Sequence, residues 1–248
     1  EDEYKRSFGP FTPGFVRIPY GDTKALEDAI NEKTCAFLVE PIQGEAGVVV
    51  PPEGFLKEAR RLCDEKNVLL VADEIQSGFG RTGTRFACEL EDVVPDAYIL
   101  GKALSGGMYP VSAVVADRDL MDLFQPGDHG STYGGNPLAA AVGREALKVL
   151  NEEHLVQRSA ELGEYFMGRL REIDSPHVEL VRGVGLWIGI VLKPEAGGAR
   201  RFCEALMERG MLCKETHENV IRIAPPLVIE KAEIDWCLER LDAVLKMD

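Results

Sequence analysis

The chain has 248 residues, of which 45% are hydrophobic and 28% charged, and its formal net charge is −14. This composition is typical of a globular protein with one large or two smaller domains. The negative charge argues against nucleic acid or an anionic membrane as a partner, and no apolar run is long enough to predict a transmembrane helix.

The cysteines are scattered through the sequence, without the C-x-x-C spacing or paired histidines of a metal site. This pattern predicts neither a metal centre nor a disulfide framework, and it favours a reducing compartment. The first residues lack the apolar segment of a secretory signal. The six cysteines are Cys35, Cys63, Cys88, Cys203, Cys213 and Cys237.

The first elements alternate between helix and strand. After a loop rich in proline and glycine (residues 7–20), an apolar stripe following Asp22 predicts a helix over residues 23–31. Residues 35–39 form a short apolar run that predicts a strand. Residues 53–66 predict an amphipathic helix whose apolar face carries Phe55, Leu56, Ala59 and Leu62.

Two further apolar runs, residues 68–72 and 98–100, show no alternation of polar and apolar residues. Such runs are typical of parallel strands buried on both faces. Residues 111–116 predict another strand and residues 119–124 a short helical turn. A glycine-rich polar loop, residues 127–137, leads into a long helix ending near residue 153, with Pro137 suited to its first position.

The remaining residues alternate between helix and strand at a shorter rhythm. Helices are expected over residues 155–173, 198–210 and 230–246, and strands over residues 178–182, 186–192, 211–214 and 220–223. We expect an α/β fold of two parts: residues 1–150 form part of a large domain with a mixed, mostly parallel sheet, and residues 151–248 form a small α+β domain.

Asp73 and Lys102 each follow one of the two predicted parallel strands, residues 68–72 and 98–100. The carboxyl ends of parallel strands meet at one edge of a sheet, where ligands of α/β proteins collect. An acid and an amine at that edge would suit pyridoxal phosphate, since the lysine can hold the cofactor and the carboxylate can keep its pyridine nitrogen protonated. The alternative is that both residues are ordinary capping or surface charges.

Six motifs occur along the chain: YKRSFGPF (residues 4–11), VEPIQGEAG (39–47), DEIQSG (73–78), GKALSGG (101–107), HGSTYGGNP (129–137) and IRIAPP (221–226). In these motifs and their order the chain resembles the class III (subgroup II) pyridoxal phosphate-dependent aminotransferases. The first and fifth motifs favour the members of that family that act on ornithine.

The resemblance implies a fold-type I transferase and a role for several residues. Lys102 would hold pyridoxal 5'-phosphate and move a proton during catalysis, and Asp73 would pair with the pyridine nitrogen. Gln76 would reach the phenolic oxygen of the ring. Thr132, and less directly Ser131, would bind the phosphate of a neighbouring subunit's cofactor, which implies a homodimer with shared active sites.

The resemblance also implies that Glu45 and Arg222 meet in the active site. The arginine would bind a carboxylate of the second substrate, and the glutamate would neutralise it when ornithine enters. The alternative is a purely structural salt bridge between domains. Glu40 would orient the active-site carboxylates, or would simply be a charge at the end of a strand.

The implied reaction transfers the δ-amino group of L-ornithine to 2-oxoglutarate, in the cytoplasm or the mitochondrial matrix. Alternatives are an acetylornithine or 4-aminobutyrate aminotransferase, or an inactive fragment that serves as a scaffold. Family members continue further before the first motif, with a phosphate-binding turn and residues that hold the ornithine α-carboxylate. We therefore expect this chain to be a piece of a longer polypeptide that binds cofactor poorly alone.

Overall fold

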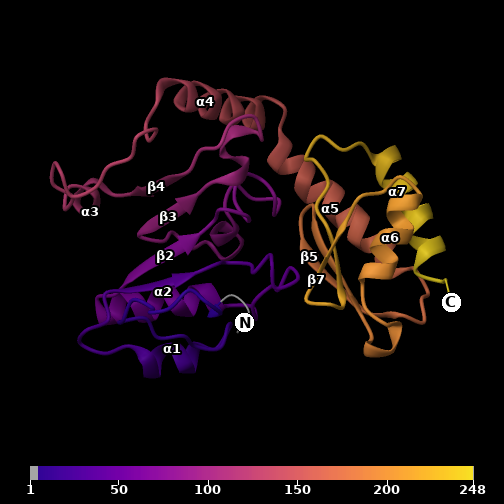
Figure 1. Cartoon of the computed structure of the whole chain (residues 1–248), viewed down its shortest axis with the longest axis horizontal. Coiled ribbons are helices and arrows are strands. Elements are labelled where there is room, and N and C mark those ends of the chain that lie inside the picture. Colours follow the sequence, from indigo (N-terminus) through magenta and orange to yellow (C-terminus); the bar gives the residue numbers. More distant parts are fainter. Residues whose placement is uncertain (1–4, 248) are drawn as a thin grey trace.

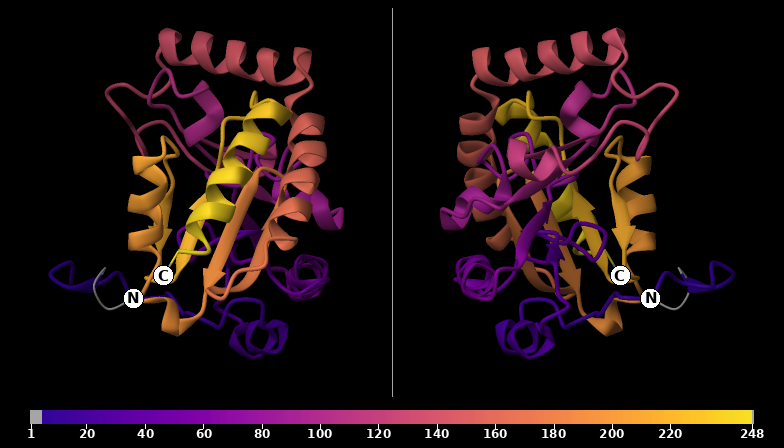
Figure 2. Two further views of the ribbon diagram at one scale, coloured as in Figure 1. Left: turned by 90° about the vertical axis from the view of Figure 1, so that its right-hand side faces the viewer. Right: turned by 90° about the vertical axis from the view of Figure 1, so that its left-hand side faces the viewer.

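Two four-stranded β-sheets organise the chain, one in each half of the sequence (Figure 1). The computed structural model describes residues 5–247, so Tyr4, which begins the first family motif, lies outside the described residues. The long helix α4 (Pro137–Glu152) crosses one end of the molecule, and α5 (Leu155–Arg171) descends from it beside the second sheet (Figure 2).

The first sheet contains β1 (Ala36–Val39), β2 (Leu69–Asp73), β3 (Ala97–Leu100) and β4 (Ala113–Ala116), in that order. The first three strands are parallel, whereas β4 runs antiparallel to β3. The mixed sheet expected from the sequence is therefore confirmed. Its three parallel strands bring the chain after β2 and after β3 to the same edge.

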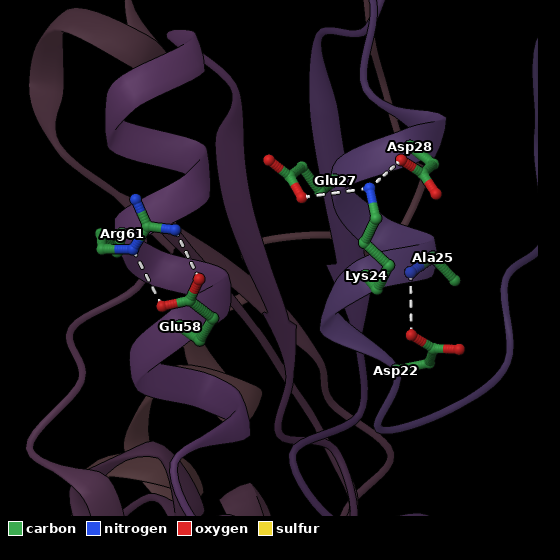
Figure 3. Close-up of polar contacts among 7 residues, drawn as sticks. All are labelled: Asp22, Lys24, Ala25, Glu27, Asp28, Glu58 and Arg61. Carbon is green, nitrogen blue, oxygen red and sulfur yellow. Dashed lines mark hydrogen bonds and ion pairs between the residues drawn. The ribbon is translucent and has the colours of Figure 1, made fainter.

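Helix α2 (Phe55–Lys66) covers one face of the first sheet. Its predicted apolar residues are all buried, and Leu56 lies in one core cluster with Val39, Leu70 and Ala72 of the strands. Helix α1 (Thr23–Ala29) packs on α2. The Asp22 carboxylate caps α1 by accepting from the Ala25 N–H at 2.8 Å, while Lys24 bridges two carboxylates on the surface (Figure 3). Such caps stabilise a helix by about 1 kcal/mol.

The opposite face of the first sheet carries apolar side chains that are partly exposed. Leu38 and Val114 are each 56% exposed, and burial alternates along β2. Burial on both faces was expected for residues 68–72 and 98–100. In β2 one face is buried and the other is partly exposed, and in β3 Tyr98 and Ile99 are partly exposed. The reason is geometric, because successive side chains of a strand point to opposite faces and α2 covers only one of them.

Short elements connect the first sheet to α4. The 3₁₀ helix η2 (Ala87–Glu91) precedes β3, and η3 (Lys102–Ser105) follows it. The short helix α3 (Arg118–Met121) overlaps the helical turn expected over residues 119–124, but it begins one residue and ends three residues earlier. Helix α4 starts as predicted, with Pro137 in its first turn and Asn136 accepting from the Ala139 N–H at 2.9 Å.

The second sheet is antiparallel, in the order β5 (Val178–Val184), β6 (Trp187–Leu192), β8 (Val220–Ile223), β7 (Lys214–Thr216). Its core is formed with α5, α6 (Arg200–Glu208) and α7 (Lys231–Val244); the 3₁₀ helix η4 (Pro194–Ala196) precedes α6. The strand predicted at residues 211–214 is placed too early. The Met211 N–H donates to Leu206 O at 2.9 Å, which continues the helix end instead of joining the sheet.

Among the contacts between the two halves are a small apolar cluster and the half-buried Arg81. Trp187 of β6 is 1% exposed and packs with Ile42, Val48 and Ala87. Arg81 donates through Nη1 to the carbonyl oxygens of Leu186, at 2.9 Å, and Pro225, at 2.6 Å. Burial lowers the pKa of Arg81 to about 10. These contacts fix the second sheet against the loop that follows β2.

Among residues 5–247 no helix is both long and apolar enough to cross a membrane. The division into domains at residue 150 stays a prediction, although α4 and α5 pass between the two sheets at that point.

Candidate functional site

Asp73 and Lys102 lie at the same edge of the first sheet. Asp73 is the last residue of β2 and is paired in register with Ile99, while Lys102 follows the end of β3 after Gly101. The Asp73 Oδ1 atom accepts from the Ile75 N–H at 3.0 Å, which orients the carboxylate in the turn after β2. The acid and the amine thus occupy neighbouring strand ends.

Lys102 has a backbone conformation that is uncommon for a residue with a side chain. Its φ is 42°, in the left-handed region, and it begins the tight turn η3 directly after extended backbone at Gly101. Such conformations carry a free-energy cost and concentrate at functional sites, where the surrounding structure holds them. The turn directs the chain sharply away from the sheet at the point where the lysine is needed.

A buried carboxylate holds the loop between Asp73 and Gln76. Glu74 is fully buried and accepts from the backbone N–H groups of Ala87, at 3.0 Å, and Cys88, at 2.9 Å, and from the Ser77 hydroxyl. Its own N–H donates to Ile99 O at 3.0 Å. These three hydrogen bonds offset the free-energy cost of burying the Glu74 carboxylate. Glu74 therefore fixes the loop to η2 and β3.

A cavity of about 830 Å³ opens between the first sheet, α4 and the segment after β8. Lys102, Gln76 and Arg222 line it together with Trp187. Most of its remaining wall is apolar, and half of that wall comes from α4 and from residues 224–228. This size is within the range of small-molecule and cofactor pockets.

Glu45 and Arg222 meet as the resemblance implied. Arg222 Nη1 lies 2.6 Å from Glu45 Oε1, and Gln76 Nε2 donates to the same oxygen at 3.2 Å. The Lys214 Nζ atom lies 3.4 Å from the other oxygen, Oε2. The hydrogen bond from Arg222 is the largest influence that lowers the pKa of Glu45, from 4.5 to about 2. The side chain of Arg222 is 14% exposed.

Glu40 lies at the end of β1, close to the same group of charges. Burial raises the pKa of its carboxyl group, and the charges of Asp73, Lys102 and Glu45 all act on it. The Gly44 N–H donates to its Oε2 atom at 3.4 Å. Glu40 therefore belongs to the polar cluster around Lys102 and is more than an isolated charge at a strand end.

The loop that carries Glu45 depends on Gly44. A Cβ atom at Gly44 would lie 1.9 Å from Gln76 Oε1 and 2.4 Å from the Trp187 ring. No side chain fits at such distances, so glycine is required for Gln76 to approach the loop. This contact links the loop after β1, the loop after β2 and strand β6.

Ser131 and Thr132 do not line the cavity within the described chain. Both lie on an exposed loop before α4, where Ser131 Oγ accepts from the Gly134 N–H at 3.0 Å. The structure thus brings together Lys102, Gln76, Glu45 and Arg222, with Asp73 at the adjacent strand end, and leaves these two hydroxyls apart.

Three residues of this region were not singled out from the sequence. Lys214 contacts Glu45, Glu74 anchors the loop after Asp73, and Arg81 joins the two halves. Glu74 falls inside the family motif DEIQSG, directly after an apolar strand, and this position was the available signal. Lys214 and Arg81 had no signal, because single cations in loops and short strands are usually solvated.

The residues present fit pyridoxal phosphate. The donor set contains an amine and a carboxylate at adjacent strand ends, with the amide of Gln76 beside them and a cavity of sufficient size. A cation, Arg222, faces the same cavity. No group of His, Cys, Asp and Glu that could hold a metal ion occurs among residues 5–247.

Comparison with known proteins agrees with this chemistry. The profile of the family described as Aminotransferase class-III matches residues 1–245. An ornithine aminotransferase of Exiguobacterium sp. is 62% identical over 245 residues, covering 99% of this chain and 60% of the relative. The chain thus spans about 60% of the length of the curated relatives it matches.

Solved structures agree with the fold. An ornithine aminotransferase from Toxoplasma gondii, crystallised with pyridoxal phosphate partly occupying its active site, is 45% identical, with a TM-score of 0.96 over 99% of this chain and 58% of that one. An acetylornithine aminotransferase from Elizabethkingia anophelis is 50% identical, with a TM-score of 0.91 over 96% and 62% of the two chains.

Proposed function

Because the chain belongs to the class-III aminotransferase family, we propose that it forms part of a pyridoxal phosphate-dependent aminotransferase acting on L-ornithine and 2-oxoglutarate. The products are glutamate-5-semialdehyde and glutamate. The observation that carries the proposal is the contact between Glu45 and Arg222 beside Lys102, since it joins a carboxylate-binding cation to a group that can cover it.

Lys102 and Asp73 perform the common chemistry of the family. Bound pyridoxal phosphate supplies an electron sink that makes a substrate C–H bond acidic. Lys102 would hold the cofactor through its Nζ atom, and the same amine would move the proton at the reacting carbon. Asp73 would balance the charge of the pyridine nitrogen, and Gln76 would hydrogen-bond the phenolic oxygen. Glu40 supports the orientation of these charges.

Glu45 and Arg222 choose between the two substrates. When ornithine presents its terminal amine, Glu45 covers Arg222, so the guanidinium does not repel the substrate. When 2-oxoglutarate enters, its second carboxylate takes the place of Glu45 on Arg222 and forms a charge-assisted pair. The same site thereby accepts an amine and a dicarboxylate in alternation.

The exposed loop with Ser131 and Thr132 serves a second subunit. Hydroxyls and accessible backbone N–H groups in a glycine-rich loop suit a phosphate. Since neither side chain lines the cavity of its own chain, we propose that Thr132, assisted by Ser131, binds the cofactor phosphate of the partner in a homodimer.

The test is an absorbance titration with pyridoxal phosphate of the complete aminotransferase of which this chain forms part. We expect a visible band that shifts on addition of L-ornithine and is absent in Lys102→Ala. A band that persists in Lys102→Ala would show that another amine reacts. The absence of any band in the unmodified complete protein would favour a cofactor-free scaffold instead.

Acetylornithine is a second candidate amine donor, because the relative from Elizabethkingia anophelis carries that activity in its name. The two candidate donors are distinguished by following the shift of the cofactor absorbance band with L-ornithine and then with acetylornithine. A faster shift with L-ornithine than with acetylornithine supports the leading proposal, and the reverse order supports the second.

A further inference from the structure

Two cations lie side by side on the edge of the second sheet. Lys214 of β7 and Arg222 of β8 are directly paired in antiparallel register, so their side chains share one face. Like charges opposite each other in a sheet are destabilising. The pairing of these two cations therefore destabilises the sheet locally. Destabilising arrangements of this kind are expected at functional sites.

Glu45 offsets this repulsion by using both of its oxygens. Its Oε1 atom contacts Arg222 at 2.6 Å, and its Oε2 atom contacts Lys214 at 3.4 Å. The two cations differ in position, because Arg222 lines the cavity and is 14% exposed, whereas Lys214 lies outside the cavity wall and is 64% exposed. A ligand in the cavity can therefore compete for one cation only.

The backbone that carries Glu45 is held at both ends of its loop. Gln43 and Val49 pair across the base of the loop, and Arg182 Nε donates to Gly47 O at 2.9 Å. Gly47 itself has a φ of 95°, which favours glycine. Movement of Glu45 away from Arg222 is therefore a rotation of its side chain, not a displacement of the loop.

A carboxylate that displaces Glu45 from Arg222 would leave two anions near one guanidinium. Without a second cation the group of charges would be −1, and repulsion between the carboxylates would weaken ligand binding. With Lys214 present, two cations face two anions. Lys214 is positioned to keep the displaced Glu45 paired.

We propose that Lys214 is a positioning residue that retains Glu45 when a dicarboxylate occupies Arg222, and that it thereby favours dicarboxylates over amines. This inference rests on the proposed function, because it assumes that Arg222 receives a substrate carboxylate. It assigns Lys214 no contact with the reacting atoms.

The test is a calorimetric titration, with glutarate, of the cofactor-loaded complete protein of which this chain forms part. Glutarate is a dicarboxylate that cannot react. In Lys214→Met we expect the Kd for glutarate to rise about threefold to fivefold. This change corresponds to about 1 kcal/mol or less, the usual energy of an exposed ion pair. Lys214→Arg should restore binding. In the half-reactions, KM for 2-oxoglutarate should rise similarly, while kcat/KM for L-ornithine stays within about twofold.

Glu215→Gln is the matched control, since Glu215 lies next in the same strand and pairs with Arg200 instead. It should change neither measurement. Unchanged glutarate binding in Lys214→Met, or absence of glutarate binding in the unmodified complete protein, would overturn the inference. A protein whose glutarate binding on Arg222 weakens in Lys214→Met but that transfers no amino group would refute the proposed function alone.

Discussion

Gly163 of α5 lies directly against the backbone of Gly185, in the turn between β5 and β6: a Cβ atom at position 163 would be 2.2 Å from the Gly185 carbonyl group. Gly185 in turn approaches the backbone of Arg81 and Thr82. Three chain segments therefore touch through glycines. This stack sets how closely the second sheet sits behind the loop that carries Gln76.

We expect Gly163→Ala to lower the free energy of unfolding by about 1–3 kcal/mol, because the added methyl group must displace backbone. Gly168→Ala, in the same helix, has no atom within 4 Å of the added Cβ. It should raise stability by about 0.5–1 kcal/mol, since alanine is the better helix former. Urea unfolding of both variants measures the contrast. Equal stability of the two would contradict the backbone contact.

Glu74→Gln should lower the free energy of unfolding by about 1–3 kcal/mol, because an amide nitrogen would face a buried N–H group that has lost its acceptor. The exposed Glu89, which accepts from the Arg85 N–H, provides the control. Glu89→Gln should change stability by about 0.5 kcal/mol or less. Thermal unfolding of the two variants measures this difference in stability. If Glu74→Gln were as stable as the unmodified chain, the buried carboxylate would not be needed to hold the loop.

Glu45→Ala should shift the preference of the site from the amine substrate toward the dicarboxylate substrate. With Arg222 uncovered, ornithine is repelled and 2-oxoglutarate meets no competing carboxylate. We expect kcat/KM for L-ornithine to fall about tenfold, which is ~1.4 kcal/mol, while that for 2-oxoglutarate is kept or improved. Half-reaction kinetics measure both values. Unchanged specificity would identify the pair as a structural salt bridge.

The Glu45 carboxylate should also make stability depend on acid pH. Because its pKa in the fold is about 2 instead of 4.5, the ionised group stabilises the fold above pH 4.5, and this contribution is lost as the pH falls through about 2. The effect is small, since the side chain is 60% exposed and solvent screens the pair. The difference in urea midpoint between the unmodified chain and Glu45→Gln should shrink over that range. A constant difference would contradict the shifted pKa.

Local patterns predicted most of the elements. The apolar stripe of α2 and the Asn136–Pro137 start of α4 depend on neighbouring residues, so periodicity and capping identify them. The start of β7 was missed because Met211 is apolar in either a strand or a helix end. The exposed face near Leu38 was missed because burial on the second face depends on what packs there, which an apolar run does not specify.

The site was predictable in a different way. The positions of Asp73 and Lys102 follow from strand ends alone. The meeting of Glu45 with Arg222 joins residues far apart in the chain, and only the family resemblance indicated it. Lys214 reaches Glu45 through the pairing of β7 with β8, a register that no local pattern encodes.

Trp187 gives the candidate site an optical property of its own. It is one of two tryptophans, is 1% exposed in the cavity wall, and lies close to Gly44, the residue before Glu45. Trp236, the other, is 38% exposed on α7 beneath the guanidinium of Arg240. A buried indole emits at a shorter wavelength than a solvent-exposed one, so intrinsic fluorescence distinguishes Trp187 from Trp236. The blue component reports occupancy of the cavity and the contact between the halves, with the red component as its internal reference.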